Sequence, residues 1–187
     1  MHIVIGAYGW QHKQWQGQFY PDDMPLDWCL SYYANEFDTL LVPFKIWSES
    51  ELEEIQSWIE EVPESFDLFF EADWELCNDN VKKKLSHELL VYRQVKFTSK
   101  TPVQSLVDCE SQRGSISGEG AIDEKIVLLH YFSENIIKLG EIRQLIEEAK
   151  DDYRNCESLY LFFDQALLDI NVLNNAKIIA DLLVSVE

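Results

Sequence analysis

Short apolar runs alternate with helical stretches along most of the chain, and this alternation restricts the fold more than any other feature. Residues 2–6 (HIVIG) form an apolar run that ends at glycine, and residues 26–35 follow with a helical pattern. A second apolar run at 38–43 precedes an amphipathic helix over 49–62, which Pro63 ends. Further strands are expected at 66–71, 103–109, 125–130 and 158–163, and further helices at 79–92, 133–150 and 171–186.

This order of elements predicts an α/β fold with a parallel sheet. Parallel strands need crossover connections, which are usually helices, and strands buried on both faces are apolar throughout. An open sheet and a closed barrel both fit, although six strands are fewer than the eight of a complete β/α barrel. At the local level, Ser48 with Glu51 three residues later predicts a capping box before the helix at 49–62.

Net charge and cysteine content indicate which partners and which cellular compartment suit the chain. The chain has 187 residues, which suits one domain spanning 1–187, and 34 acidic against 15 basic residues give a net charge of −19. Such a field repels phosphate backbones and anionic lipids, so nucleic-acid and membrane binding are disfavoured. The four cysteines form no CxxC pair, which predicts reduced thiols, and no leader or bilayer-length apolar run is present. We therefore expect a cytoplasmic protein.

Candidate functional residues are found by reading the positions where strands end. Ligands of parallel α/β proteins bind at the carboxyl ends of the strands. Carboxylates and an imidazole at these positions can act as acids and bases or bind a divalent cation, although strand-end acids also serve as helix caps and solvated loop residues. No nucleotide-binding motif is present, and no cofactor is predicted. The polar candidates are Glu71, Asp73, Asp108, His130 and Asp164.

The first loop resembles a known family. IGAYGWQHKQWQGQFYP, residues 5–21, resembles the opening of the domain-of-unknown-function 72 family, the YecE-like proteins. The stretches SYYANEFDTLLVPFKIW, EIQSWIEEVPESFDLFFEA, KIVLLHYF and SLYLFFDQ are similar to later segments of that family. The resemblance implies a TIM-barrel-like fold and no established activity. The short middle at about 78–102 implies an internally trimmed or partly open barrel of about six strands.

Several strand-end residues differ from those that the resemblance leads one to expect. Leu41 and Pro43 stand where the family has a glutamate and an asparagine, Glu71 replaces a lysine, and Leu128 replaces an arginine. Asp164, with the residue after it, replaces a pair of asparagines. Of the polar strand-end residues that the family leads one to expect, the chain keeps His130 and Asp108. A pocket altered in this way cannot hold an anionic substrate as the family pattern would.

Three functions follow in order of preference. The first is a non-catalytic binding or regulatory protein that takes a small molecule. The alternative is a metal-assisted hydrolase or isomerase in which His130 is the base and Asp108 acts with it. Nucleic-acid processing comes last because of the net charge. A trimmed barrel also exposes strand edges, which favours a homodimer. The predicted ligand-binding residues are Tyr8, Trp10, Trp15, Tyr20, Glu71 and Asp164.

Overall fold

The computed structural model describes residues 1–72, 95–99, 126–133, 137–165 and 168–185. The strands are β1 (His2–Tyr8), β2 (Thr39–Val42), β3 (Asp67–Ala72), β4 (Val95–Ser99), β5 (Ile126–Ser133) and β6 (Ser158–Gln165). The helices are α1 (Cys29–Tyr33), α2 (Phe44–Glu49), α3 (Leu52–Glu61), α5 (Leu139–Asp152) and α6 (Ile170–Val184), with short 3-10 turns η1 (Lys13–Trp15) and η2 (Leu26–Trp28).

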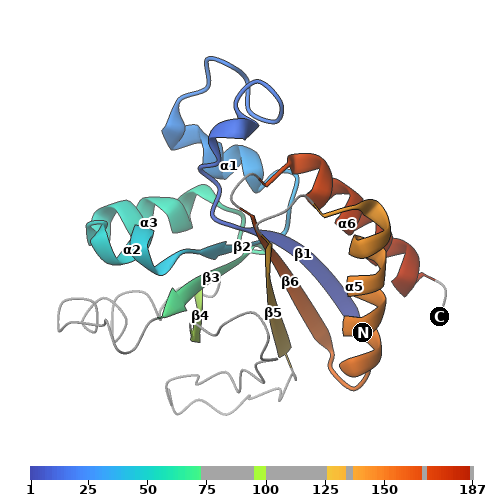
Figure 1. Ribbon diagram of the computed structural model, residues 1–187. Coiled ribbons are helices and arrows are strands. Elements are labelled where there is room, and N and C mark those ends of the chain that lie inside the picture. The colour runs from blue at the N-terminus through green and yellow to red at the C-terminus, as the bar shows by residue number, and fades with distance from the viewer. Residues whose placement is uncertain (73–94, 100–125, 134–136, 166–167, 186–187) are drawn as a thin grey trace, which may run out of the picture.

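The six strands form one sheet in the order β4-β3-β2-β1-β6-β5, and every neighbouring pair is parallel. The first strand lies in the centre and pairs with the last one, from His2 opposite Ser158 to Ala7 opposite Phe163. Helices α5 and α6 lie beside β1 and β6, whereas α2 and α3 lie on the side of β2 and β3 (Figure 1). The prediction of an α/β fold with a parallel sheet is confirmed.

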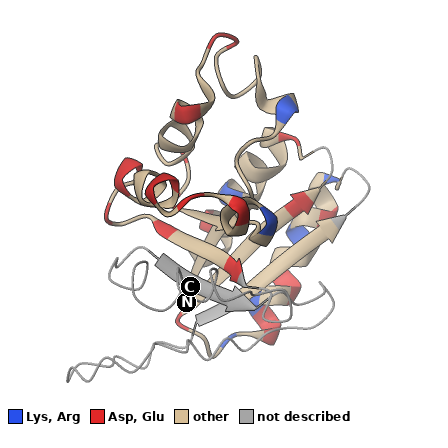
Figure 2. Ribbon diagram, turned by 90° about the vertical axis from the view of Figure 1, so that its left-hand side faces the viewer, with Lys and Arg blue, Asp and Glu red and all other residues tan. Residues whose placement is uncertain are grey.

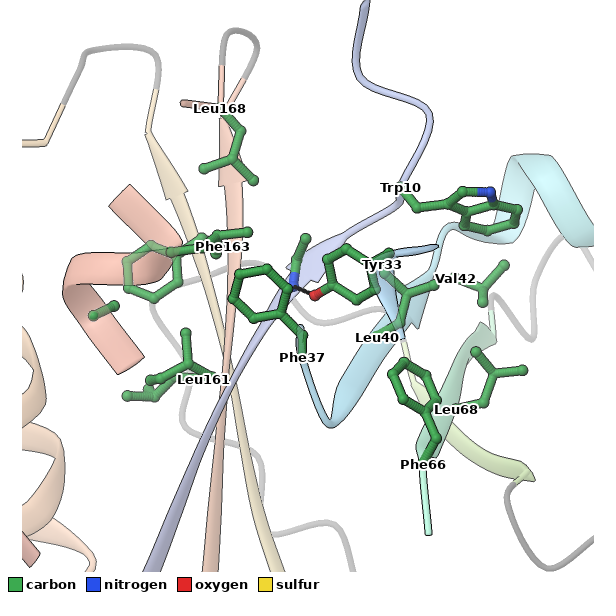
Figure 3. Packing of buried hydrophobic residues seen from close by; sticks show 14 of the residues in the cluster. Trp10, Tyr33, Phe37, Leu40, Val42, Phe66, Leu68, Leu161, Phe163 and Leu168 are labelled. Carbon is green, nitrogen blue, oxygen red and sulfur yellow. Dashed lines mark hydrogen bonds between the residues drawn. The ribbon is translucent and has the colours of Figure 1, made fainter. Parts of the chain in front are cut away.

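Alternate residues of β1, β2, β3, β5 and β6 enter two separate apolar clusters. On the face covered by helices, side chains such as Ile5, Leu161 and Phe163 join the main core (Figure 3). The other face carries a smaller cluster. This division follows from the two-residue period of a β-strand, because successive side chains point to opposite faces. The smaller cluster consists of Val4, Leu41, Phe69, Leu128, Tyr160 and Phe162.

The face with the smaller cluster is concave. The ring of Phe69 in β3 lies 4.9 Å from that of Tyr160 and 5.4 Å from that of Phe162, both in β6. Two strands separate β3 from β6, so in a flat sheet the two backbones would be roughly 14 Å apart. The sheet must therefore curl, as in a barrel. Among the described strands, β4 and β5 are edges, and no pairing between them closes the sheet.

Tyr33 of α1 links β1 to β2 from within the main core. Its hydroxyl accepts a hydrogen bond from the Ala7 amide at 3.0 Å and donates one to the Thr39 carbonyl, also at 3.0 Å. The ring is fully buried and stacks on Phe37 at 4.8 Å (Figure 3). A side-chain hydroxyl thus satisfies two backbone groups that the strand ladder does not pair.

Two elements of the structure, β4 and α2, were not predicted, and the predicted capping box at Ser48 is wrong. The strand beside β3 is Val95–Ser99, whereas the one predicted at 103–109 lies outside the described residues. The helix α2 was not predicted, and it contains Ser48, so Ser48 is not the N-cap of α3; that residue is Glu51, without a side-chain capping bond. The reason is that the chain becomes helical one turn earlier, directly after Pro43. The predicted helix at 79–92 and most of the middle segment at 78–102 also lie outside the described residues.

Two further observations concern context. Within the described ranges, no helix has both the length and the apolar character needed to cross a lipid bilayer. Cys29 and Cys156 are both buried.

Candidate functional site

Four polar side chains meet toward the carboxyl ends of β1, β3, β5 and β6, on the concave face. The Tyr8 hydroxyl donates to Glu71 Oε2 at 2.7 Å, and the Tyr8 ring stacks on the His130 imidazole with centroids 4.6 Å apart. His130 Nε2 lies 3.1 Å from Asp164 Oδ2. These four residues, which we call the strand-end row, were all predicted from the sequence, and the structure brings them together.

Glu71 anchors this row in the protein interior. Its side chain is only 4% exposed, and Oε2 accepts hydrogen bonds from Tyr8 and from the Phe44 amide at 2.9 Å. Phe44 is the first residue of α2, so the carboxylate sits where the positive end of a helix favours negative charge. The Glu71 carbonyl also accepts a hydrogen bond from Trp47 Nε1 at 2.7 Å. Glu71 is therefore a satisfied buried carboxylate that holds Tyr8 and α2 in place.

Tyr8 remains protonated throughout the neutral range. Burial raises the pKa of its hydroxyl well above the usual range, and the negative charges of Glu71 and Asp164 raise that pKa further. The neutral hydroxyl can therefore donate to Glu71, while the ring supports His130 from one side. Tyr8 fixes the position of the imidazole rather than offering its hydroxyl to a ligand.

His130 and Asp164 are the accessible members of the row. Their side chains are 21% and 23% exposed, in contrast to the buried Glu71. A carboxylate only accepts hydrogen bonds, so the pairing favours the tautomer with the proton on His130 Nε2. The Nδ1 atom then carries a lone pair. A half-exposed imidazole oriented by a carboxylate can bind a polar ligand or act as a general acid or base.

His12 is a neighbour of the row that the sequence analysis did not single out. Its Nε2 lies 3.2 Å from the Gly9 carbonyl, directly after β1, and its ring packs against Trp15 at 4.4 Å. Burial lowers the pKa of His12, and the nearby Asp164 charge opposes this only in part. His12 is therefore a neutral imidazole close to Asp164. Its position in the loop after the first strand was the one signal available in the sequence.

The three aromatic candidates of the first loop lie in the main core. Trp10, Trp15 and Tyr20 are each at most 2% exposed. The Trp15 indole donates to the Leu168 carbonyl at 2.6 Å, and the Tyr20 hydroxyl donates to the Trp10 carbonyl at 2.8 Å. Packing and hydrogen bonding within the protein account for these residues, and their contact with a ligand stays a prediction.

Two further candidates from the sequence, Asp108 and Asp73, lie outside the described residues. Asp108 was the predicted partner of His130. Within the described residues, no group of three or more His, Cys, Asp or Glu side chains is arranged to hold a metal ion. Gln165, next to Asp164, is 4% exposed, and its Nε2 has no hydrogen-bond partner among the residues that the structure describes. Among the described candidates, His130 and Asp164 are thus a contacting pair whose side chains are both partly exposed.

The fold and the first loop together identify the family of the chain. The family model described as "Protein of unknown function DUF72" matches residues 4–104, which is more than half of the sequence. The chain belongs to the DUF72 family. The match includes the first loop, α1 to α3 and the first four strands of the described sheet. No curated protein matches the chain.

Solved DUF72 structures resemble this one in fold. A DUF72 family protein from Thermotoga maritima superimposes with a TM-score of 0.64 at 13% identity, over 95% of this chain and 99% of that one. A DUF72 family protein from Enterococcus faecalis gives a TM-score of 0.47 at 11% identity, over 95% and 92% of the two chains. At these identities the first likeness supports the fold alone. The chain is therefore a DUF72 family protein with an α/β fold.

Proposed function

We propose that the protein binds a small neutral or cationic molecule at the strand-end row, through His130 and Asp164. The observation that carries this proposal is their 3.1 Å pairing on a buried support, with both side chains still partly exposed. The Tyr8 ring stacks on His130, and the hydrogen bond to Glu71 holds Tyr8 in place. Little conformational freedom would therefore be lost when a ligand binds. The carboxylate of Asp164 and the net charge of −19 disfavour an anionic ligand.

Binding rather than turnover is the preferred role because the row offers few free reactive groups. Glu71 and the Tyr8 hydroxyl are already engaged with each other, which leaves one imidazole and one carboxylate accessible. Such a pair suffices to recognise a hydroxyl, amide or ammonium group. A regulatory or binding protein is consistent with this arrangement.

A ligand-observed NMR screen of polyols, primary amines and amino-acid amides tests the proposal. We expect a hit that shifts the His130 imidazole resonances and that Asp164→Asn no longer binds. Glu157→Gln is the matched control, because Glu157 precedes β6 at the opposite end of the sheet. The proposal is wrong if no compound shifts the His130 resonances, or if binding survives Asp164→Asn unchanged.

General acid–base chemistry at His130 is the second candidate, and the same carboxylate–imidazole pairing favours it. With the proton on Nε2 held by Asp164, Nδ1 can accept a proton from a bound substrate, as an isomerase requires. Incubation of each hit in D₂O would show exchange of a carbon-bound proton by NMR. We expect the exchange to disappear in His130→Gln, and the absence of exchange in the unmodified protein would leave binding as the function.

The metal-assisted version with Asp108 remains a proposal, which calorimetric titration with Mg²⁺, Mn²⁺ and Zn²⁺ tests.

Homodimer formation is also part of the proposal. Its support is the pair of sheet edges at β4 and β5, because unpaired strand edges favour association. Gel filtration over a range of protein concentrations would reveal it, and a monomer at every concentration would exclude it.

A further inference from the structure

An exposed apolar surface lies on the long loop that follows β1. Leu26 and Trp28, both in η2, are 66% and 64% exposed, although most other large apolar side chains of the loop are buried. Figure 1 shows this loop, residues 16–28, extending from the body of the protein above α1. Single exposed apolar residues are ordinary, but a leucine and a tryptophan two residues apart at the base of a projecting loop form a small binding surface.

The loop is held in one conformation by its own hydrogen bonds. The Gly17 amide donates to the Tyr20 carbonyl at 2.7 Å, with Gly17 at a φ of 75° in the left-handed region. The Gln16 side chain donates to the carbonyls of Pro21 and Asp22 at 2.6 and 2.9 Å. Tyr20 fastens the base of the loop to the core through the Trp10 carbonyl. A surface on such a framework loses little freedom when a partner binds.

Exposed carboxylates lie on the same turn and loop as the two apolar side chains. Asp27 is exposed between Leu26 and Trp28 in the sequence, and it is close enough to Glu61, at the end of α3, to raise the pKa of Glu61 further after partial burial has raised it. Asp22 and Asp23 are exposed on the same loop. Figure 2 shows acidic positions on the projecting loop and on the helices near it. The turn thus exposes apolar and negatively charged side chains together.

We propose that Leu26, Trp28, Asp27 and Glu61 form a docking surface for a basic segment of another protein. An arginine or lysine of that segment would lie over the Trp28 indole, which attracts cations, and neighbouring basic side chains would pair with Asp27 and Glu61. The charge argues against other occupants. A second copy bound through this same surface would bring its own Asp27 and Glu61 against those of the first, and anionic lipids or nucleic acids would be repelled by the net charge of −19. This leaves the sheet edges at β4 and β5 available for the proposed dimer.

The test uses protein labelled with 5-fluorotryptophan and ¹⁹F NMR. The Trp28 resonance is assigned as the one missing in Trp28→Phe. The probe is the capped peptide Gly-Arg-Leu-Arg-Gly, and the comparison peptide carries glutamates in place of both arginines. We expect the arginine peptide alone to shift the Trp28 resonance to saturation. For the variant that lacks Trp28, the diffusion of the peptide gives the association constant. Trp28→Ala should lower this constant about two- to fivefold.

Charge variants separate a specific surface from general acidity. Asp27→Asn with Glu61→Gln should lower the association constant by about threefold or more. Asp152→Asn with Asp181→Asn removes the same charge from exposed positions of α5 and α6, and should change it less than about twofold because of salt screening. Equal losses in the two double variants would refute the proposal, as would equal binding of both peptides or no shift of Trp28. Concentration-dependent dimerisation that Trp28→Ala abolishes would make a second copy the occupant and would likewise overturn it.

Discussion

Removal of the Tyr33 hydroxyl should destabilise the protein far more than a single oxygen atom suggests. In Tyr33→Phe the Ala7 amide loses its acceptor and the Thr39 carbonyl loses its donor, and both residues are fully buried. Each unsatisfied buried backbone group costs about 1–3 kcal/mol, so we expect a loss of about 2–6 kcal/mol in the free energy of unfolding. For a protein of this size the loss corresponds to about 4–24 °C in Tm.

The surroundings of the ring explain why the loss should not be relieved by movement. The Tyr33 ring stacks on Phe37 at 4.8 Å and lies parallel to Trp15 at 6.0 Å, so a phenylalanine would occupy the same place without its hydroxyl. The Ala7 amide could then reach the Thr39 carbonyl only if β1 and β2 moved together. The effect should be local to the junction of β1 and β2.

Urea denaturation followed by circular dichroism measures the free energy, and hydrogen exchange of the Ala7 amide measures the local effect. Tyr32→Phe on the same helix is the control, because Tyr32 is only half-buried and its hydroxyl makes no hydrogen bond to any described residue. We expect Tyr32→Phe to change stability by less than about 0.5 kcal/mol. A Tyr33→Phe loss below about 1 kcal/mol, or unchanged exchange of the Ala7 amide, would contradict the reasoning.

Two further predictions concern packing and pH. In Gly6→Ala the new methyl group would lie 2.8 Å from Thr39 Cγ2 and 3.0 Å from Phe162 Cε1. We therefore expect the free energy of unfolding, measured by urea denaturation, to fall by about 1–3 kcal/mol. Gly140→Ala is the control and should lose no stability, because the space around Gly140 is open. Burial holds the pKa of His12 in the folded protein below its ordinary value of 6.5. Between the folded-state pKa and 6.5 the unfolded chain therefore binds more protons than the folded one. The free energy of unfolding should fall as the pH drops through that interval. His12→Gln should flatten this part of the stability curve, and identical slopes for both proteins would show that His12 does not contribute.

The sequence predicted most of the sheet because its strands are apolar throughout. Runs such as HIVIG and SLYLFF mark strands that are covered on both faces, and their positions agree with β1 and β6 to within two residues. The strand β4 was missed because its residues, VKFTS, mix polar and apolar types without a clear run. Helix α2 was missed because it is short and because its first amide is satisfied by Glu71, a residue 27 positions away that no local pattern indicates.

The candidate site was predictable in its members but not in its pairings. The rule that strand ends meet in a parallel sheet pointed to Tyr8, Glu71, His130 and Asp164. It did not show that Glu71 would be buried and engaged by Tyr8, or that His130 would pair with Asp164. The contact of Tyr8 with Glu71 joins the non-adjacent strands β1 and β3 and depends on strand order and curvature, whereas His130 and Asp164 meet because β5 and β6 are neighbours in the sheet. Sequence periodicity contains neither quantity.

The partnership of β1 with β6 has a consequence for biosynthesis. Strand β1 acquires its longer neighbour, β6, only when residues 158–165 have been translated. Until then one edge of β1 stays unpaired, and the nascent chain displays a hydrophobic strand that other chains can join. Chaperone dependence during translation should therefore end late, after the last strand has emerged, and a ribosome stalled before residue 158 should carry a chain that proteases digest readily.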